Sequence, residues 1–399
     1  MEAQGLSMGD QFPHVALMSS SNPLDVHSFS GTIFYMARAL QAEFPDLEIV
    51  RSSRPRWFEP MQRLVSKATR RRADPYYWHS LNCWFAKRLA KRWRGRPVVV
   101  IGVVNASLVA ELASVVPVIN ISDSTFELMQ TEHEVFWSLD RRTALRAEED
   151  ERNSIVRSVH NSFSSRWAGR SAIDHYGARP EDVSVISWGC NFDPVPASEV
   201  RPLSSRDECR LLFIGGEWLR KGGDVMFAVA EMLASKGIPV RVDVVGAPPE
   251  ALPERPWLHY RGYLSKGNPE HLALLRSLMR EAELLLLPTR RDCTPMVFAE
   301  ASAYGTPAVT RDVGGVADVV RDGANGIVLP EDADAAAFAE VIEQLWSSPL
   351  RYAKLRASTR LEYDNRLNWA VWARHIRELV EVLSANGAIT PAGTPRSAD

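Results

Sequence analysis

The sequence predicts an α/β protein with two doubly wound domains, and three observations predict it. Short, largely apolar runs alternate with helical patterns, and a break rich in proline and serine at residues 193–207 divides the chain. Continuous apolarity is typical of parallel strands buried on both faces. The predicted strands are 15–18, 98–104, 118–121, 183–186, 211–214, 240–245, 284–287 and 308–309. The clearest helices are 31–44, 224–236 and 269–282, which complete the alternation expected of doubly wound sheets.

The length of 399 residues, of which 45% are hydrophobic, predicts more than one core. We place the first domain at 1–200 and the second at 201–364. A helix at 365–385 is expected to pack back on the first domain. The tail 386–399 carries prolines and glycines and is expected to be disordered.

Charge and cysteine content exclude several classes of protein. The net charge of −2 gives no reason for a general affinity for nucleic acid or membranes, and no nucleic acid partner is expected. The four cysteines lack the spacing of zinc ligands or redox motifs, which favours a reducing compartment. No secretory signal or bilayer-spanning run is evident, so we expect a cytoplasmic protein.

The strongest candidate site lies in 284–307, LLLLPTRRDCTPMVFAEASAYGTP. A buried strand leads into a polar loop, and Thr294 and Pro295 are expected to be the N-cap and the first residue of a helix. The backbone N–H groups near Met296 and Val297 would then hold a phosphate at the carboxyl end of a parallel strand. The pattern alone equally allows a capped core helix without a ligand.

The acidic pair in this segment carries a family resemblance. Residues 292–307 resemble the donor-site motif of glycosyltransferase family 4, the retaining enzymes of GT-B fold, with two acids separated by seven residues and a Gly-x-Pro stop. The resemblance implies that Glu300 binds the ribose of a nucleotide sugar and that Asp292 lies beside the transferred sugar and its phosphate. Asp292 departs from the family, which usually has Glu at that position.

A basic loop supports the same resemblance. Residues 211–223, LLFIGGEWLRKGG, form a predicted strand and a glycine-flanked loop with Arg220 and Lys221. These cations suit a diphosphate leaving group. The family usually has Arg where Gly216 stands here, and we infer that Arg220 supplies the missing guanidinium. An exposed basic turn is the alternative.

Weaker matches extend the resemblance over most of the chain except residues 45–95. Residues 162–193 resemble the last unit of the first domain in the family. Residues 313–318 and 322–326 resemble the turns after the donor helix, whose glycines are expected to shape the site. Gly262, Tyr263 and Leu264 resemble the segment whose backbone reads the nucleobase.

The first domain offers two further candidates. Gly31 follows the first strand, where the family brings a loop close to the donor diphosphate; an N-cap role for Ser30 is the alternative. Asp123 follows the strand 118–121, near the position of a polar residue that faces the transferred sugar in the family. A helix cap is the alternative for Asp123.

Residues 51–96 carry fourteen Lys or Arg against two acids, with aromatic residues interleaved. Such a segment suits an anionic membrane surface or a phosphorylated acceptor, and a solvated basic face is the alternative. Peripheral contact with the inner face of a membrane is therefore part of the expectation.

The resemblance implies a retaining glycosyltransferase that moves a sugar from a nucleotide diphosphate sugar to a hydroxyl, in surface polysaccharide or glycolipid assembly. The two Rossmann-like domains would face a central cleft. No cofactor and no metal are expected, because cationic side chains and a helix dipole offset the diphosphate charge. The alternatives are a nucleotide-sugar epimerase of the same fold and a non-catalytic nucleotide-sugar-binding protein.

Overall fold

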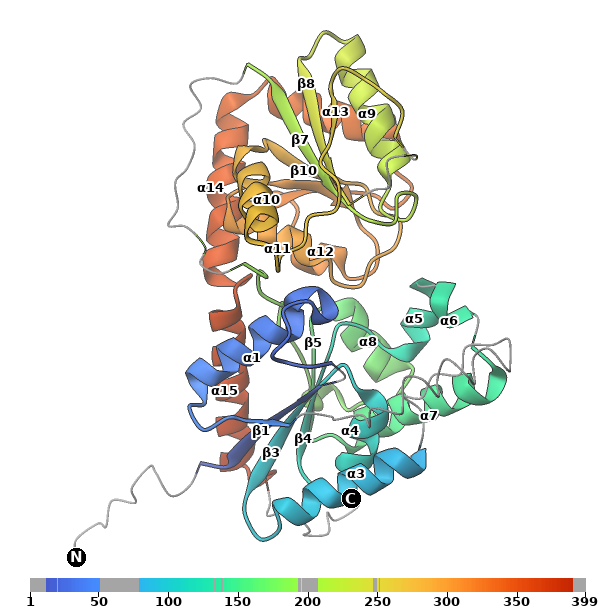
Figure 1. Cartoon of the computed structure of the whole chain (residues 1–399), viewed down its shortest axis with the longest axis vertical. Coiled ribbons are helices and arrows are strands. Elements are labelled where there is room, and N and C mark those ends of the chain that lie inside the picture. The colour runs from blue at the N-terminus through green and yellow to red at the C-terminus, as the bar shows by residue number, and fades with distance from the viewer. Residues whose placement is uncertain are drawn as a thin grey trace, which may run out of the picture. The chain divides into compact units, whose positions relative to one another are not determined.

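A computed structural model describes residues 12–19, 21–50, 79–132, 134–137, 139–192, 195, 207–246, 250 and 252–389. The chain divides into two compact units (Figure 1). The first comprises Met1–Ile186 and Ala373–Asp399, and the second comprises Ser187–Trp372. Residues 51–78 of the basic segment, residues 193–194 and 196–206 of the predicted linker, and the tail from 390 lie outside the described residues.

The first unit contains a six-stranded parallel sheet of order β2-β1-β3-β4-β5-β6. Its strands are β1 (His14–Ser19), β2 (Glu48–Val50), β3 (Val98–Val103), β4 (Val118–Ser122), β5 (His160–Phe163) and β6 (Val183–Val185). Its helices are α1 (Thr32–Glu43), α3 (His79–Arg92), α4 (Ala106–Leu112), α5 (Phe126–Glu132), α6 (Glu134–Trp137), α7 (Arg141–Arg157) and α8 (Arg166–Asp174), with short 3-10 turns at Ser28–Gly31 and Pro180–Asp182.

The second unit contains a six-stranded parallel sheet of order β12-β11-β10-β7-β8-β9. Its strands are β7 (Cys209–Ile214), β8 (Val240–Val245), β9 (Leu258–Tyr260), β10 (Leu284–Leu287), β11 (Ala308–Arg311) and β12 (Gly326–Leu329). Its helices are α9 (Gly223–Ser235), α10 (Pro269–Glu281), α11 (Met296–Ala303), α12 (Val316–Val319), α13 (Ala335–Trp346) and α14 (Pro349–Asn365). Figure 1 shows α9 and α13 on one face of this sheet and α10, α11 and α14 on the other.

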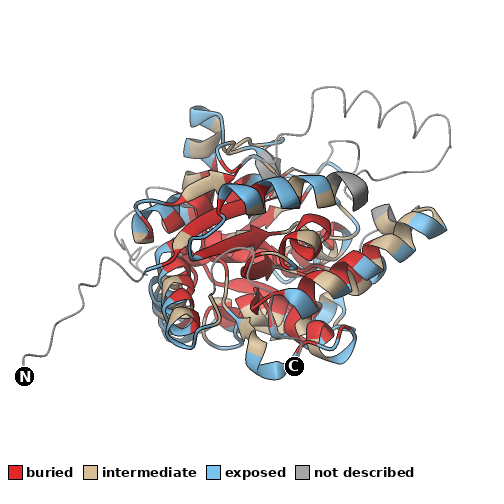
Figure 2. Cartoon of the chain, turned by 90° about the horizontal axis from the view of Figure 1, so that it is seen from below, coloured by how far each residue is buried: buried red, intermediate tan, exposed pale blue. Residues whose placement is uncertain are grey.

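Both cores follow from the apolar runs of the sequence. In the second unit, Leu284–Leu287 of β10 is buried along its whole length between the two helical layers. In Figure 2 the buried residues follow the strands and the inner faces of the helices. Since a strand covered on both faces buries every side chain, continuous apolarity was the correct signal for these parallel sheets. The predicted α/β class with two Rossmann-like doubly wound domains is confirmed.

The division between the units lies earlier than the sequence suggested. Cys190 and Phe192 belong to the hydrophobic core of the second unit, and the Cys190 N–H donates to the Leu367 carbonyl at 3.0 Å. Residues 187–192 are therefore part of the second unit, where the sequence placed a first domain ending at 200. The last helix, α15 (Trp369–Ala385), begins in the second unit and continues into the first, where Arg377 Nη1 donates to the Glu43 carbonyl at 2.8 Å.

Candidate active site at the end of the second sheet

The candidate site lies where the strand order of the second sheet reverses. From β7 the chain proceeds to β8 and β9 on one side and to β10, β11 and β12 on the other. Ligands of doubly wound sheets bind outside the carboxyl ends of the strands at this switch point. The loop after β7 carries Arg220 and Lys221, and the loop after β10 carries Asp292. The structure thus brings the two predicted motifs together within one unit.

Charge pairing joins these loops directly. The Lys221 ammonium forms an ion pair with Asp292 Oδ2, and Arg220 Nη1 lies 3.8 Å from Asp292 Oδ1. Thr289 Oγ1 donates to Asp292 Oδ2 at 3.4 Å. All three charged side chains are largely buried, so the alternative of an exposed basic turn is wrong.

Arg220 has further partners besides Asp292. Its Nε donates to Glu217 Oε2 at 2.9 Å, and its Nη1 donates to the Arg291 carbonyl at 2.8 Å. Burial opposes the guanidinium charge, but hydrogen bonding to Glu217 and the Asp292 charge outweigh burial and raise the pKa of Arg220. Arg220 is thus a cation whose position is held by Glu217, the Arg291 carbonyl and Asp292.

Glycines allow the loops of the site to approach one another. Gly222 has a φ of 76°, and a Cβ on it would lie 2.0 Å from the Pro288 carbonyl oxygen. Gly314 has a φ of 52°, and its Cβ would lie 2.0 Å from the Asp292 carbonyl oxygen. The neighbouring Gly315 N–H donates to that same carbonyl at 3.2 Å. The turn after β11 therefore supports the backbone of Asp292, in line with the shaping role expected for these glycines.

Helix α11 begins one residue later than expected. Pro295 occupies the N-cap position with an extended ψ of 105°, and Met296 is the first helical residue. The prediction that Thr294 caps the helix and that Pro295 is its first residue was therefore wrong. Pro295 offers no side-chain cap, so the first-turn N–H groups at Met296 and Val297 stay the candidates for an anion.

Glu300 lies within α11 and is buried. Its carboxylate forms an ion pair with Lys266, in the loop between β9 and α10. The sequence reasoning missed Lys266, because no local pattern links it to a residue 34 positions away. Nearby, Gly262 has a φ of 72° and accepts from the Gly246 N–H at 3.0 Å, while Tyr263 is exposed and Leu264 packs on the core.

The candidates of the first unit lie at the carboxyl ends of its strands. Gly31, with a φ of 86°, is the N-cap of α1 without a side-chain hydrogen bond, so Ser30 does not have the capping role. Among the described residues, positive φ outside glycine occurs at Phe29, Ser30 and Val104, after β1 and β3. These two strands flank the switch point of the first sheet, where strained backbone is often functional.

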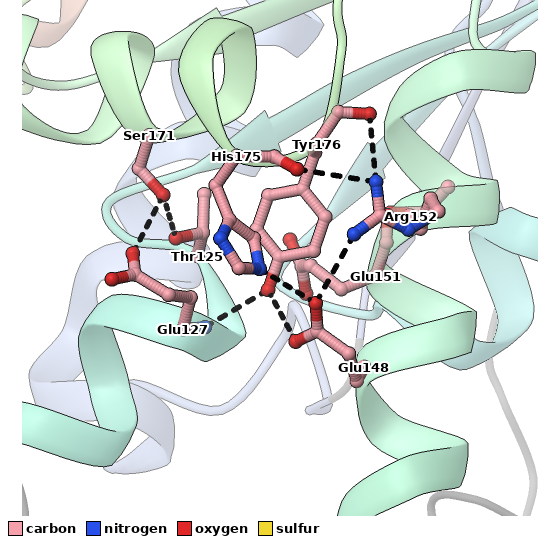
Figure 3. A network of polar contacts seen from close by, with 9 residues as sticks. Thr125, Glu127, Glu148, Glu151, Arg152, Ser171, His175 and Tyr176 are labelled. Atoms are coloured by element: carbon pink, nitrogen blue, oxygen red, sulfur yellow. Dashed lines mark hydrogen bonds and ion pairs between the residues drawn. The ribbon is translucent and has the colours of Figure 1, made fainter.

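Asp123 directly follows β4 and is half-buried. The next helix, α5, is anchored by the polar network of Figure 3. Tyr176 Oη accepts from the Glu127 N–H at 2.9 Å and donates to Glu148 Oε2 at 2.8 Å, while Ser171 Oγ donates to Glu127 Oε2 at 3.0 Å. These hydrogen bonds connect α5 to α7, α8 and the residues just after α8. They hold the first turn of α5, which begins three residues after Asp123. The role of Asp123 stays a prediction.

The described part of the chain offers neither a cluster of metal ligands nor a membrane-spanning helix. In these ranges no group of three or more His, Cys, Asp or Glu side chains is placed to hold a metal ion. Within the same ranges, no helix is both long and apolar enough to cross a bilayer. The expectation of metal-independent chemistry stays a prediction.

Solved structures of other proteins share the fold of this chain. The structure aligns with Anabaena Alr3699/HepE in complex with UDP at a TM-score of 0.60 and 14% identity, over 93% of this chain and 100% of that one. It aligns with sucrose-phosphate synthase from Thermosynechococcus elongatus at a TM-score of 0.65 and 16% identity, over 94% and 100% of the two chains. The two doubly wound units are therefore those of a GT-B protein.

The sequence matches one family model and several curated relatives, each over part of the chain. Residues 208–348 match the family model described as glycosyl transferases group 1. The chain is 31% identical over 245 residues to D-inositol 3-phosphate glycosyltransferase of Geodermatophilus obscurus, covering 57% of this chain and 53% of that protein. It is 30% identical over 242 residues to the enzyme of the same name from Thermobispora bispora, covering 56% of each. The chain thus spans about half the length of these relatives, and the family resemblance expected from the sequence is confirmed.

Proposed function

We propose that this protein is a retaining glycosyltransferase that moves a sugar from a nucleotide diphosphate sugar to a hydroxyl group. One observation carries the proposal: Arg220, Lys221 and Asp292 converge at the switch point of the second sheet, next to the start of α11. A cluster of two cations and one carboxylate beside a helix N-terminus suits a diphosphate with a sugar attached.

Each residue has a stated role in this proposal. Arg220, Lys221 and the first-turn N–H groups of α11 stabilise the charge that grows on the leaving diphosphate. Glu300 accepts hydrogen bonds from the ribose, and Asp292 lies beside the transferred sugar. The bond from the anomeric carbon to the diphosphate oxygen breaks, and a bond to the acceptor oxygen forms on the same face. The acceptor proton passes to the leaving phosphate, so no protein base is assigned.

The relatives suggest which substrates to test first. The curated relatives are named D-inositol 3-phosphate glycosyltransferases, and the HepE protein has been solved with UDP and with UDP-glucose. UDP-glucose is therefore the first donor probe, and inositol 3-phosphate is the first acceptor probe. A saccharide or lipid-linked acceptor at an anionic membrane is the alternative acceptor, and the basic segment 51–96 motivates it.

A panel of UDP, GDP and ADP sugars tests the proposal. The purified protein is incubated with each donor, with and without acceptor, and free nucleotide is measured. Nuclear magnetic resonance then gives the anomer of the product. Nucleotide release with retained configuration supports the proposal, and Glu300→Ala should lose nucleotide binding. Inversion at the sugar C2 would indicate the epimerase, binding without turnover would indicate a binding protein, and no binding of any nucleotide sugar would refute all three.

A further inference from the structure

The ion pair between Glu300 and Lys266 lies in an enclosed position near the candidate site. Glu300 lies on α11 among Ala299, Ala301 and Ser302, and its side chain is 4% exposed. Lys266 reaches it from the loop between β9 and α10, and its side chain is 19% exposed. A carboxylate in such a place needs a cation, because an unpaired buried charge is strongly destabilising.

Other cations lie near this ion pair. The Lys266 ammonium lies 5.1 Å from the centroid of the Phe192 ring, and Arg276 Cζ lies 6.0 Å from that centroid. Arg276 and Arg280 come from α10, and they face the phenol of Tyr304 as well. Lys266 forms an ion pair with the Glu300 carboxylate.

The remaining titratable groups in this environment are neutral at physiological pH. Burial, together with the Glu300 charge, raises the pKa of the Cys190 thiol. Burial raises the pKa of Tyr304 to about 12, although the charges of Arg276 and Arg280 oppose the shift. Neither side chain carries a positive charge in any protonation state, so neither can pair with the Glu300 carboxylate as Lys266 does. The orientation of Glu300 thus depends on Lys266.

Lys266 lies close in sequence to the segment expected to contact the nucleobase. It follows directly after 262–264, the segment expected to lie along the nucleobase, and it contacts the carboxylate expected to bind the ribose. The Lys266 ammonium contacts Oε1 of Glu300 and, as a point charge, restrains the position of that oxygen. A substitution of Lys266 would therefore alter ribose recognition indirectly, through the position of the Glu300 carboxylate.

We propose that Lys266 is a positioning residue: it orients the Glu300 carboxylate toward the ribose hydroxyls and thereby sets the preference for ribonucleotides over 2′-deoxynucleotides. This inference rests on the proposed function. Lys266 acts through Glu300, so its loss affects the sugar part of the nucleotide. The discrimination between ribose and deoxyribose is a property that a merely structural pair would not change.

Calorimetric titration of the intact protein tests the inference. UDP, GDP and ADP identify the nucleotide that binds the wild type, and that nucleotide and its 2′-deoxy form are then titrated into Lys266→Met and Lys266→Arg. Lys266→Met should bind the ribonucleotide roughly 10- to 100-fold more weakly, as expected for loss of a charged hydrogen bond, with the ribose to deoxyribose ratio falling toward one. Lys266→Arg should keep the wild-type ratio. Lys236→Met is the matched control, because Lys236 pairs with Glu343 on the surface of the same unit.

The outcomes separate the inference from the proposed function. A wild-type ratio in Lys266→Met, or a wild type that binds both forms alike, overturns the positioning role while the transferase proposal stands. If no nucleotide binds the wild type, both fall. Circular dichroism checks folding, and if Lys266→Met is unfolded, Lys266→Gln takes its place, since it keeps a hydrogen-bond donor without the charge. A wild-type ratio in that variant would equally overturn the role.

Discussion

The Lys221 ammonium pairs with the Asp292 carboxylate, and this contact joins the loop after β7 to the loop after β10. Their side chains are 15% and 11% exposed, so the pair is shielded from water. Shielding strengthens any interaction with a charge that enters the site. A diphosphate bound here would meet a cation already fixed by a carboxylate on the opposite loop.

The first prediction concerns this cation. Lys221→Met removes a positive charge from the point where the leaving diphosphate is expected, and it leaves Asp292 without its ion-pair partner. We expect turnover at saturating donor to fall by about 10²- to 10³-fold, the usual effect of removing one group that stabilises transition-state charge. Initial rates of nucleotide release measure it.

A companion variant tests the geometry of the same pair. Asp292→Glu introduces the residue that glycosyltransferase family 4 usually has at this position. The variant should stay active, since the carboxylate is kept. Wild-type turnover in Lys221→Met would remove Lys221 from the proposed mechanism. Loss of activity in Asp292→Glu would instead show that the site is built around the shorter side chain.

The second prediction concerns Arg290, which clamps the basic loop. Its guanidinium donates to Asp224 at 2.8 and 2.7 Å and to the Leu219 carbonyl, and its backbone N–H donates to the Arg220 carbonyl at 2.9 Å. Hydrogen bonding within the pair lowers the pKa of Asp224 and raises the pKa of Arg290. Arg290 therefore fixes the backbone from which Arg220 and Lys221 project.

Arg290→Met should loosen that backbone and weaken binding of a nucleoside diphosphate about 10-fold, the equivalent of one charge-assisted hydrogen bond. Binding of the free nucleoside should hardly change, because it lacks the phosphates that the loop is expected to contact. Calorimetry with UDP and uridine makes the comparison. Arg255→Met, which breaks the surface pair with Glu231, is the control. Equal loss for UDP and uridine would contradict a role in phosphate binding.

Arg290 and Lys266 show why part of the site could not be predicted. Asp292 and Lys221 were expected together because each lies in a motif that follows a buried strand, and parallel strands end at one edge of a sheet. Arg290 and Lys266 pair with residues 66 and 34 positions away, and their neighbours in sequence give no signal of this. Such pairs depend on loop geometry, which local pattern does not encode.

Strand β5 shows the corresponding limit for the fold. Its sequence, HNSF, is polar except for its last residue, yet all four residues are buried. Asn161 accepts from Asn120 Nδ2 at 3.1 Å and donates to the Ile155 carbonyl at 3.0 Å, so the tertiary structure satisfies its polar groups. An apolar-run criterion therefore missed this strand. The predicted strands also lacked β2 and β9, which have three residues each, and β12, which has four.

The third prediction concerns Gly314. Its positive φ and its close approach to the Asp292 carbonyl leave no room for a side chain. Gly314→Ala must displace the backbone of Asp292, and a shift of about 1 Å at a catalytic group can lower the rate by about 10²-fold. Turnover should therefore fall strongly at saturating donor. Initial rates and thermal unfolding measure the effect.

Gly323→Ala is the matched control for this substitution. Gly323 has a φ of 72°, and a Cβ on it meets no atom within 4 Å. Both variants carry the strain of alanine in the left-handed region, about 1–2 kcal/mol, so their difference isolates the contact with Asp292. Equal activity of the two variants would show that the approach of Gly314 to Asp292 does not matter for turnover.

The fourth prediction concerns Glu151, one turn beyond Glu148 on α7 in the network of Figure 3. Burial, reinforced by the charges of Glu148 and Asp150, raises the pKa of Glu151 to about 8. Burial also raises the pKa of Tyr176, to which the Glu151 charge contributes. Glu151 is therefore mostly protonated in the folded protein at neutral pH, whereas in the unfolded chain it ionises near its ordinary value of 4.5.

The sign of the pH effect follows from linkage. Between pH 4.5 and about 8 the folded state binds the Glu151 proton and the unfolded state releases it, so the free energy of unfolding falls as pH rises through this window. Glu151→Gln is uncharged throughout and lacks this component. The variant should therefore gain stability relative to wild type between pH 5 and pH 8, by more than about 1 kcal/mol, since one pKa unit corresponds to about 1.4 kcal/mol.

Hydrogen exchange of the α7 amides at pH 5 and at pH 8 measures the stability of the first unit directly. Glu149→Gln removes an exposed carboxylate from the same helix and is the control. A constant difference between Glu151→Gln and wild type across this range would mean that Glu151 is ionised in the folded protein.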